Sequence, residues 1–192
     1  CYSCADSTLT DGHRSAVGPI VAILIRLAVP VAIIRWPFAG MIAAIVADAM
    51  EVVIIGLIGV GDFSDYTSAD KLLDTYMLAF AAAVSLQWEN RLARFTSLAL
   101  FCYRVAGVVV LEVTSARWVL FVFPNLFELF FLYHLATAGR FRRFEMRGYA
   151  SLALVLLLLL AVKMPQEYVL HVLEFGPWQW FHMDVLGIGS TI

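Results

Sequence analysis

Residues 149–162 read YASLALVLLLLLAV, a run of leucine, alanine and valine without a charged side chain. A helix that is apolar on all sides is typical of a buried core or a membrane span. The rest of the chain agrees with the second alternative. Of 192 residues, 62% are hydrophobic and 15% charged, and the mean hydropathy is +0.86. Soluble domains are about half apolar and a quarter charged. The sequence therefore predicts an integral membrane protein.

Further apolar stretches lie on the N-terminal side of this run. A bilayer core about 30 Å thick takes roughly 20 residues of helix per crossing. The expected spans are 17–34, 38–60, 72–88, 96–113, 119–138 and 149–162. The predicted fold is an all-α, polytopic integral membrane helical bundle with about six transmembrane helices. We expect an extracytoplasmic segment at 1–16, one transmembrane domain at 17–165, and an interfacial amphipathic tail at 166–192, where tyrosine and tryptophan alternate with polar residues.

The basic residues predict the orientation. When successive loops are placed on alternate sides, seven basic residues share one side: Arg35, Arg91, Arg94, Arg140, Arg142, Arg143 and Arg147. Four lie on the other: Arg14, Lys71, Arg117 and Lys163. Cytoplasmic loops carry the excess of Lys and Arg. We therefore expect a multi-pass protein with both termini outside the cytoplasm. Cys1 and Cys4 would then lie in an oxidising compartment, where a disulfide between them is possible.

Charged residues interrupt the predicted spans close to their midpoints: Arg26, Asp48, Glu51, Arg104 and Glu128. A charge at the bilayer centre costs about 3 kcal/mol on insertion scales, so such groups turn inward and pair or line a wet cavity. Two interpretations stay open. The charges form a closed network that fixes the register of the helices, or they line a pathway for protons, cations or a charged substrate.

Four acids resemble a family pattern. Asp48-x2-Glu51 followed by Asp70-x3-Asp74 is similar to the acid motif of the CDP-alcohol phosphatidyltransferases, six-helix membrane enzymes that join a CDP-activated lipid to an alcohol. The resemblance covers residues 48–74. It implies that Asp48, Glu51 and Asp70 are ligands of divalent metal ions and that Asp74 is the catalytic base. The chain has Val52 where the family has glycine, and the arginine of the motif is missing.

The expected depths of Asp48 and Asp74 in the membrane argue against the transferase function. With a third span that begins at Leu72, Asp74 lies near one membrane surface while Asp48 lies near the middle. The offset of about ten residues at 1.5 Å each is about 15 Å, so we expect no divalent ion to bridge the two carboxylates. The leading hypothesis is a non-enzymatic protein, a subunit of a larger membrane complex or a proton or cation pathway. The transferase is the alternative.

The expected partners are the lipid bilayer and other membrane subunits. The net charge of −2 and the lack of a nucleic-acid-binding motif argue against nucleic acid. No motif in the sequence identifies a cofactor.

Overall fold

The structure, a computed structural model, describes residues 20–58, 66–114, 116, 118–139, 141, 146 and 148–171. The side chains of residues 51–58, 66–70, 167 and 169–171 lie outside this description. So do Cys1, Cys4 and most of the predicted interfacial tail. Every element in the described part is helical. After helical residues 20–28 the order is η1 (Val29–Val31), α2 (Ala32–Arg35), α3 (Pro37–Ile58), α4 (Tyr66–Ser85), α5 (Arg91–Thr114), α6 (Val119–Val122), α7 (Phe127–Gly139) and α8 (Tyr149–His171).

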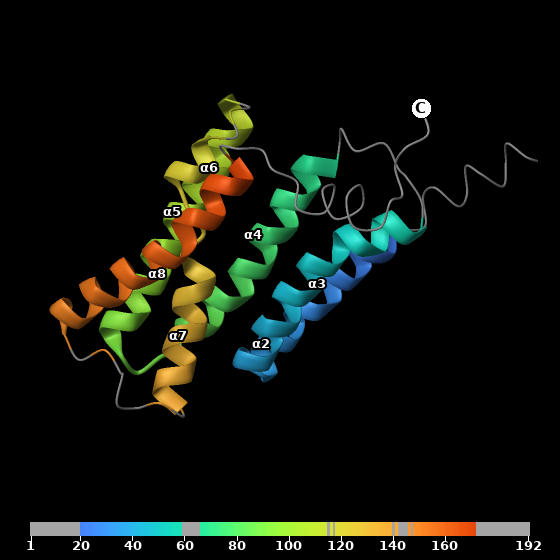
Figure 1. Cartoon of the computed structure of the whole chain (residues 1–192). Helices are drawn as coiled ribbons and strands as arrows, with labels where there is room; N and C mark the ends of the chain where they lie inside the picture. Colours follow the sequence, from blue (N-terminus) through green and yellow to red (C-terminus); the bar gives the residue numbers. More distant parts are fainter. Residues whose placement is uncertain are drawn as a thin grey trace, which may run out of the picture.

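Helix α4 lies between two groups of helices (Figure 1). On one side, α2 and α3 lie side by side; on the other, α5, α6, α7 and α8 are grouped. Helix α7 also contacts α3 and α4, so it joins the two groups. The arrangement puts α4 in contact with both groups.

A tight turn joins α2 to α3. The first helical region changes to a 3-10 turn at Val29–Val31, which contains Pro30, and ends at Arg35 before Pro37 begins α3. Gly40 then packs against the backbone of the preceding helix, where a Cβ atom would lie 2.6 Å from the Ile33 nitrogen. The two helices can approach this closely because position 40 has no side chain.

Helix α4 begins six residues earlier than the sequence predicted. The expected polar connection ended at Lys71, but the helix starts at Tyr66. Ala69 has high helix propensity, and Thr and Ser at 67–68 are less favourable but do not exclude a helix. Asp74 is therefore two turns inside α4, about 12 Å along the axis from its first residue.

Helix α5 also begins earlier than expected, at Arg91 instead of residue 96. Asn90 precedes it, and its side-chain Oδ1 accepts a hydrogen bond from the Ala93 backbone N–H at 3.2 Å. This is an N-terminal cap, which satisfies one of the amide groups that a helix start leaves without a partner. The Asn90 amide donates to the Met146 carbonyl at 3.1 Å. Arg91 and Arg94 are thus on a helix and not in a loop.

The fifth expected span is broken. Helix α6 ends at Val122, and α7 begins at Phe127. Pro124 lies in the interval, which is not helical, and proline lacks the backbone N–H that would continue the helix. The sixth span is longer than expected: α8 continues through Pro165 to His171, so the beginning of the predicted tail is helical.

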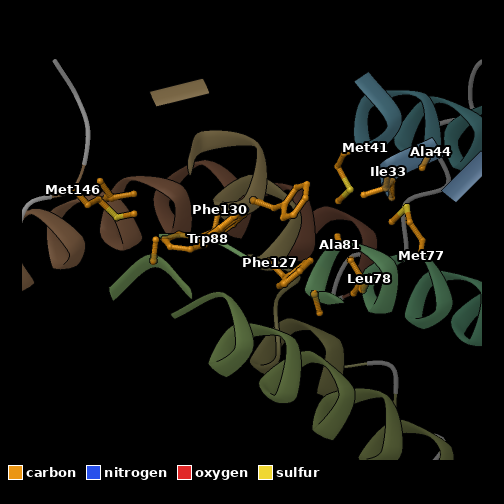
Figure 2. Packing of buried hydrophobic residues seen from close by; sticks show 14 residues of the cluster. Ile33, Met41, Ala44, Met77, Leu78, Ala81, Trp88, Phe127, Phe130 and Met146 are labelled. Atoms are coloured by element: carbon orange, nitrogen blue, oxygen red, sulfur yellow. The ribbon is translucent and has the colours of Figure 1, made fainter. Parts of the chain in front are cut away.

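The core is aromatic and centred on α7. Phe127, Phe130 and Phe131 are completely buried, and they lie among residues of α3 and α4 such as Met41 and Leu78 (Figure 2). Trp88, after α4, packs its ring 5.4 Å from that of Phe131. These contacts fix the position of α7 against the α3–α4 pair.

Three helical segments of the described part are long and apolar enough to cross a membrane: Arg91–Thr114, Val119–Gly139 and Tyr149–Gln166. Only 6% of the third span is buried within the protein. A helix whose apolar side chains are not buried by other parts of the protein can face the lipid of a membrane. The prediction of an all-α membrane protein is confirmed at this level.

Candidate functional site

Arg26 brings two carboxylates together. Its Nη2 atom lies 2.5 Å from Oδ1 of Asp48 on α3, and the same nitrogen donates to Oδ1 of Asp74 on α4. The Arg26 side chain is 5% exposed, whereas that of Asp48 is 44% exposed and that of Asp74 is 16% exposed. A buried guanidinium therefore joins three separate helical segments, and Asp48 is its most accessible partner.

The shared nitrogen sets the distance between the acids. Two oxygens that each lie within hydrogen-bonding distance of one nitrogen can be no more than about 6 Å apart. The expectation that about 15 Å of depth separates Asp48 from Asp74 is wrong, because both carboxylates contact the same Arg26 nitrogen. Helix α3 does not end early at Gly56; it continues to Ile58.

A second cation and a small cavity complete the described site. Lys71 lies one turn before Asp74, with Nζ 3.9 Å from Oδ2 of that residue. Next to the pair, Arg26, Pro30, Ala44 and Asp48 are among the residues that line a cavity of about 10 Å³. That volume corresponds to about one water molecule. Arg26 and Lys71 thus balance the charges of Asp48 and Asp74.

Glu51 and Asp70, the other two acids of the pattern, lie on α3 and α4, but their side chains are outside the described part. No group of three or more potential metal ligands occurs among the side chains that the structure describes.

Arg104 lies elsewhere and binds a carbonyl oxygen. Its side chain, on α5, is buried, and Nη1 donates to the Phe123 carbonyl at 3.0 Å. The hydroxyl of Tyr103 donates to the Val122 carbonyl at 2.5 Å. Both carbonyls lie where α6 ends, and a carbonyl in a membrane-spanning segment needs a donor from the protein. Arg104 therefore stabilises the break between α6 and α7.

Glu128 lies in the first turn of α7, just beyond that break. Its Oε1 accepts a hydrogen bond from Asn125 Nδ2 at 2.6 Å. Arg104 and Lys163 are among the charges that act on it electrostatically, as is Asp74. Glu128 thus has a hydrogen-bond partner at the break, and the described contacts of Arg26 are with Asp48 and Asp74.

Sequence reasoning missed two relationships in this site. It did not group Lys71 with the interior charges, although its i, i+3 spacing from Asp74 is a known signal for a pair on one helix face. It also did not link Asp74 to Arg26, which is 48 residues away in the sequence. A contact between residues so far apart in the sequence leaves no local pattern from which it could be predicted.

Comparison with known proteins adds no relative: no family model, no curated protein and no solved structure matches this chain.

Proposed function

We propose that this chain is a membrane enzyme that joins a CDP-activated lipid to an alcohol, with Asp48 and Asp74 in its active site. The observation that supports it is the shared Arg26 nitrogen, which brings the first and last acids of the pattern within about 6 Å. Such proximity is a condition for metal-assisted transfer, because several oxygen ligands must converge on one ion.

The chemistry of the donors fits a divalent cation. Carboxylate oxygens are the ligands that Mg²⁺ prefers, and Asp48, 44% exposed, is accessible. In the proposed site Glu51 and Asp70 would add two negative charges to the four charges of Arg26, Lys71, Asp48 and Asp74, which balance. Asp48, Glu51 and Asp70 would hold the ion, which would offset the charge of the pyrophosphate and of the leaving group.

In the proposed reaction the Asp74 carboxylate accepts the proton of the alcohol hydroxyl. The hydroxyl oxygen forms a bond to the phosphorus that carries the lipid, the bond from this phosphorus to the bridging oxygen breaks, and CMP leaves with that oxygen. Arg26 would orient both carboxylates. Its contact with Asp74 makes it a positioning residue.

The membrane arrangement proposed for this enzyme has six spans. Helical residues 20–35, α3 and α4 would add three crossings to the three span-length segments. The basic clusters near residues 35, 91–94 and 140–147 would lie on one side of the membrane, and the excess of Lys and Arg favours the cytoplasm for that side. Both termini would then lie outside.

The test measures CMP release from CDP-diacylglycerol by the purified full chain in mixed micelles, with Mg²⁺ or EDTA and a set of small alcohols. We expect release that depends on Mg²⁺ and on the alcohol. Asp74→Asn and Asp48→Asn should lower it at least 100-fold, while Glu89→Gln, which changes an exposed acid, should not. Release that is absent with every alcohol, or that persists in Asp74→Asn, would contradict the proposal.

A second candidate has an observation in its favour. The described charges around Arg26 balance, and the adjacent cavity holds about one water molecule. A closed pair of this kind suits a non-enzymatic subunit of a membrane complex or a proton or cation pathway. A subunit would co-purify with partner chains after gentle solubilisation. A pathway would move charge across vesicles that contain the chain alone, and Asp48→Asn would abolish that current.

A further inference from the structure

The guanidinium of Arg26 lies between the two carboxylates of the proposed site. Its Nη2 atom is 2.5 Å from Oδ1 of Asp48 and also contacts Oδ1 of Asp74. Carboxylate oxygens bind Mg²⁺ at about 2.0–2.1 Å and Ca²⁺ at about 2.3–2.6 Å. A divalent ion that joined these two oxygens would therefore need almost the same place as the Arg26 nitrogen. The two cations cannot contact both oxygens at the same time.

Electrostatic repulsion acts in the same direction as this steric conflict. A divalent ion on the Asp48 carboxylate would lie next to the Arg26 guanidinium, whose positive charge is permanent. The Arg26 side chain is only 5% exposed, and charges that are buried are screened little by water and salt. An ion at Asp48 therefore favours the departure of the guanidinium.

The helix that carries Arg26 is distorted one turn further along the chain. It changes to a 3-10 turn at Val29–Val31, and Pro30 has no N–H that could donate to the carbonyl of Arg26, four residues earlier. Proline residues and short 3-10 stretches inside helices are typical positions of kinks and hinges. The segment with Arg26 can therefore change direction at this point without the loss of a regular helical hydrogen bond to that carbonyl.

In the described part of the site, the exposed side of Asp48 offers the guanidinium a way out. The cavity beside Arg26, lined by Val29, Pro30 and Leu73 among others, has a volume of about 10 Å³. This corresponds to about one water molecule and is too small for a guanidinium. The Asp48 side chain, in contrast, is 44% exposed. A displaced Arg26 side chain would therefore become accessible to reagents.

From these observations we infer that Arg26 is a tethered cation that exchanges with the divalent ion of the proposed site. Arg26 orients the two carboxylates until the ion takes its place, and it returns when the ion leaves. The exchange spares the site a buried carboxylate without a cation, which is costly, and it releases Asp74 for the proton of the alcohol. The inference rests on the proposed function, of which it names the regulation, and its test measures the ion and Arg26 instead of turnover.

Competition is tested with Mn²⁺, which shares the preference of Mg²⁺ for oxygen ligands and whose free concentration is measured by electron paramagnetic resonance. The purified full chain in detergent micelles is stripped with EDTA, exchanged into buffer and titrated. We expect Arg26→Gln to bind Mn²⁺ at least tenfold more tightly than the wild type, because the competing cation is gone. Arg26→Lys keeps a cation and should bind more weakly than Arg26→Gln.

Arg35→Gln is the matched control, since it removes an exposed arginine that stacks on Trp36. It should bind Mn²⁺ like the wild type. Equal or weaker binding by an Arg26→Gln protein that elutes normally on size exclusion would show that the guanidinium does not compete, and would overturn the inference.

A second measurement follows Arg26 in the wild-type chain. Phenylglyoxal modifies accessible guanidinium groups, and mass spectrometry of the peptides gives the extent at each arginine. Mn²⁺ should increase the modification of Arg26 several-fold, and Asp48→Asn should abolish the increase. Arg104, which is buried and donates to a backbone carbonyl, should stay protected throughout. Unchanged modification of Arg26 at Mn²⁺ concentrations that fill the site would refute the exchange.

The outcomes separate the exchange from the transferase. Mg²⁺-dependent CMP release by a wild-type chain whose Arg26 stays protected would refute the exchange alone. Tighter Mn²⁺ binding by Arg26→Gln without CMP release from the wild type would support the exchange and contradict the transferase. No binding of Mn²⁺ by either protein would contradict both, because both need a divalent ion at Asp48.

Discussion

Asp48 of α3 and Asp74 of α4 contact one nitrogen, Nη2 of Arg26, through their Oδ1 atoms. The two acids belong to helices that are separate in the sequence, and the guanidinium is almost completely buried. This relationship supports the proposed active site, and it also determines the energetic consequences of changing any of the three side chains.

Arg26→Leu should destabilise the protein strongly, because it leaves two carboxylates near each other without their cation. Breaking a buried pair by removing one partner generally costs about 3 to 5 kcal/mol. The free energy of unfolding can be measured by titration with SDS in mixed micelles. Arg35→Leu, which changes an exposed arginine that stacks on Trp36, is the control.

A double-mutant cycle separates this coupling from a general loss of packing. Arg26→Leu combined with Asp74→Leu should cost less than the sum of the single changes, because neighbours that interact are not additive. Strict additivity would show that the Arg26–Asp74 pair contributes nothing to stability.

Arg104→Leu should destabilise the break between α6 and α7. It removes the donor to the Phe123 carbonyl, and a buried acceptor without a partner costs about 1 to 3 kcal/mol. Protease cleavage near residues 122–126 should become faster in the variant. Arg91→Leu changes an exposed arginine on the same helix and should have no effect on cleavage there. Unchanged cleavage in Arg104→Leu would show that the bond does not hold the break.

Gly40→Ala tests the close approach of α2 and α3. The new Cβ atom would lie 2.6 Å from the Ile33 nitrogen and 2.7 Å from the Ala32 carbonyl carbon, so the backbone must move. Such overpacking typically costs about 1 to 3 kcal/mol. Gly139→Ala is the matched control, since a Cβ atom there meets nothing within 4 Å. Equal free energies of unfolding for the two variants would contradict this packing.

Labelling of engineered cysteines tests the proposed topology. In a background without Cys1, Cys4 and Cys102, Asp65→Cys should react with an impermeant maleimide added outside cells. Arg143→Cys should react only after the membrane is opened, because the basic clusters favour the cytoplasm. The reverse pattern of labelling would invert the orientation.

The sequence by itself was enough to predict that this protein lies in a membrane and that its chain is helical. The apolar run at 149–162 indicated a lipid-facing helix, and only 6% of the span Tyr149–Gln166 in α8 is buried within the protein. The expected span 149–162 is helical throughout. These predictions succeeded because hydrophobic length acts on the chain locally.

The tertiary structure decided which charges meet. The sequence showed that Arg26, Asp48 and Asp74 exist, but their meeting depends on how the first helical segment, α3 and α4 pack against one another. Arg104, expected in the same network, donates a hydrogen bond to a carbonyl at the break. Each of these contacts depends on the axial position and rotation of one helix relative to another. Those quantities are set by the packing of α7 and its buried phenylalanines against α3 and α4, because close-packed side chains accept few relative positions of two helices.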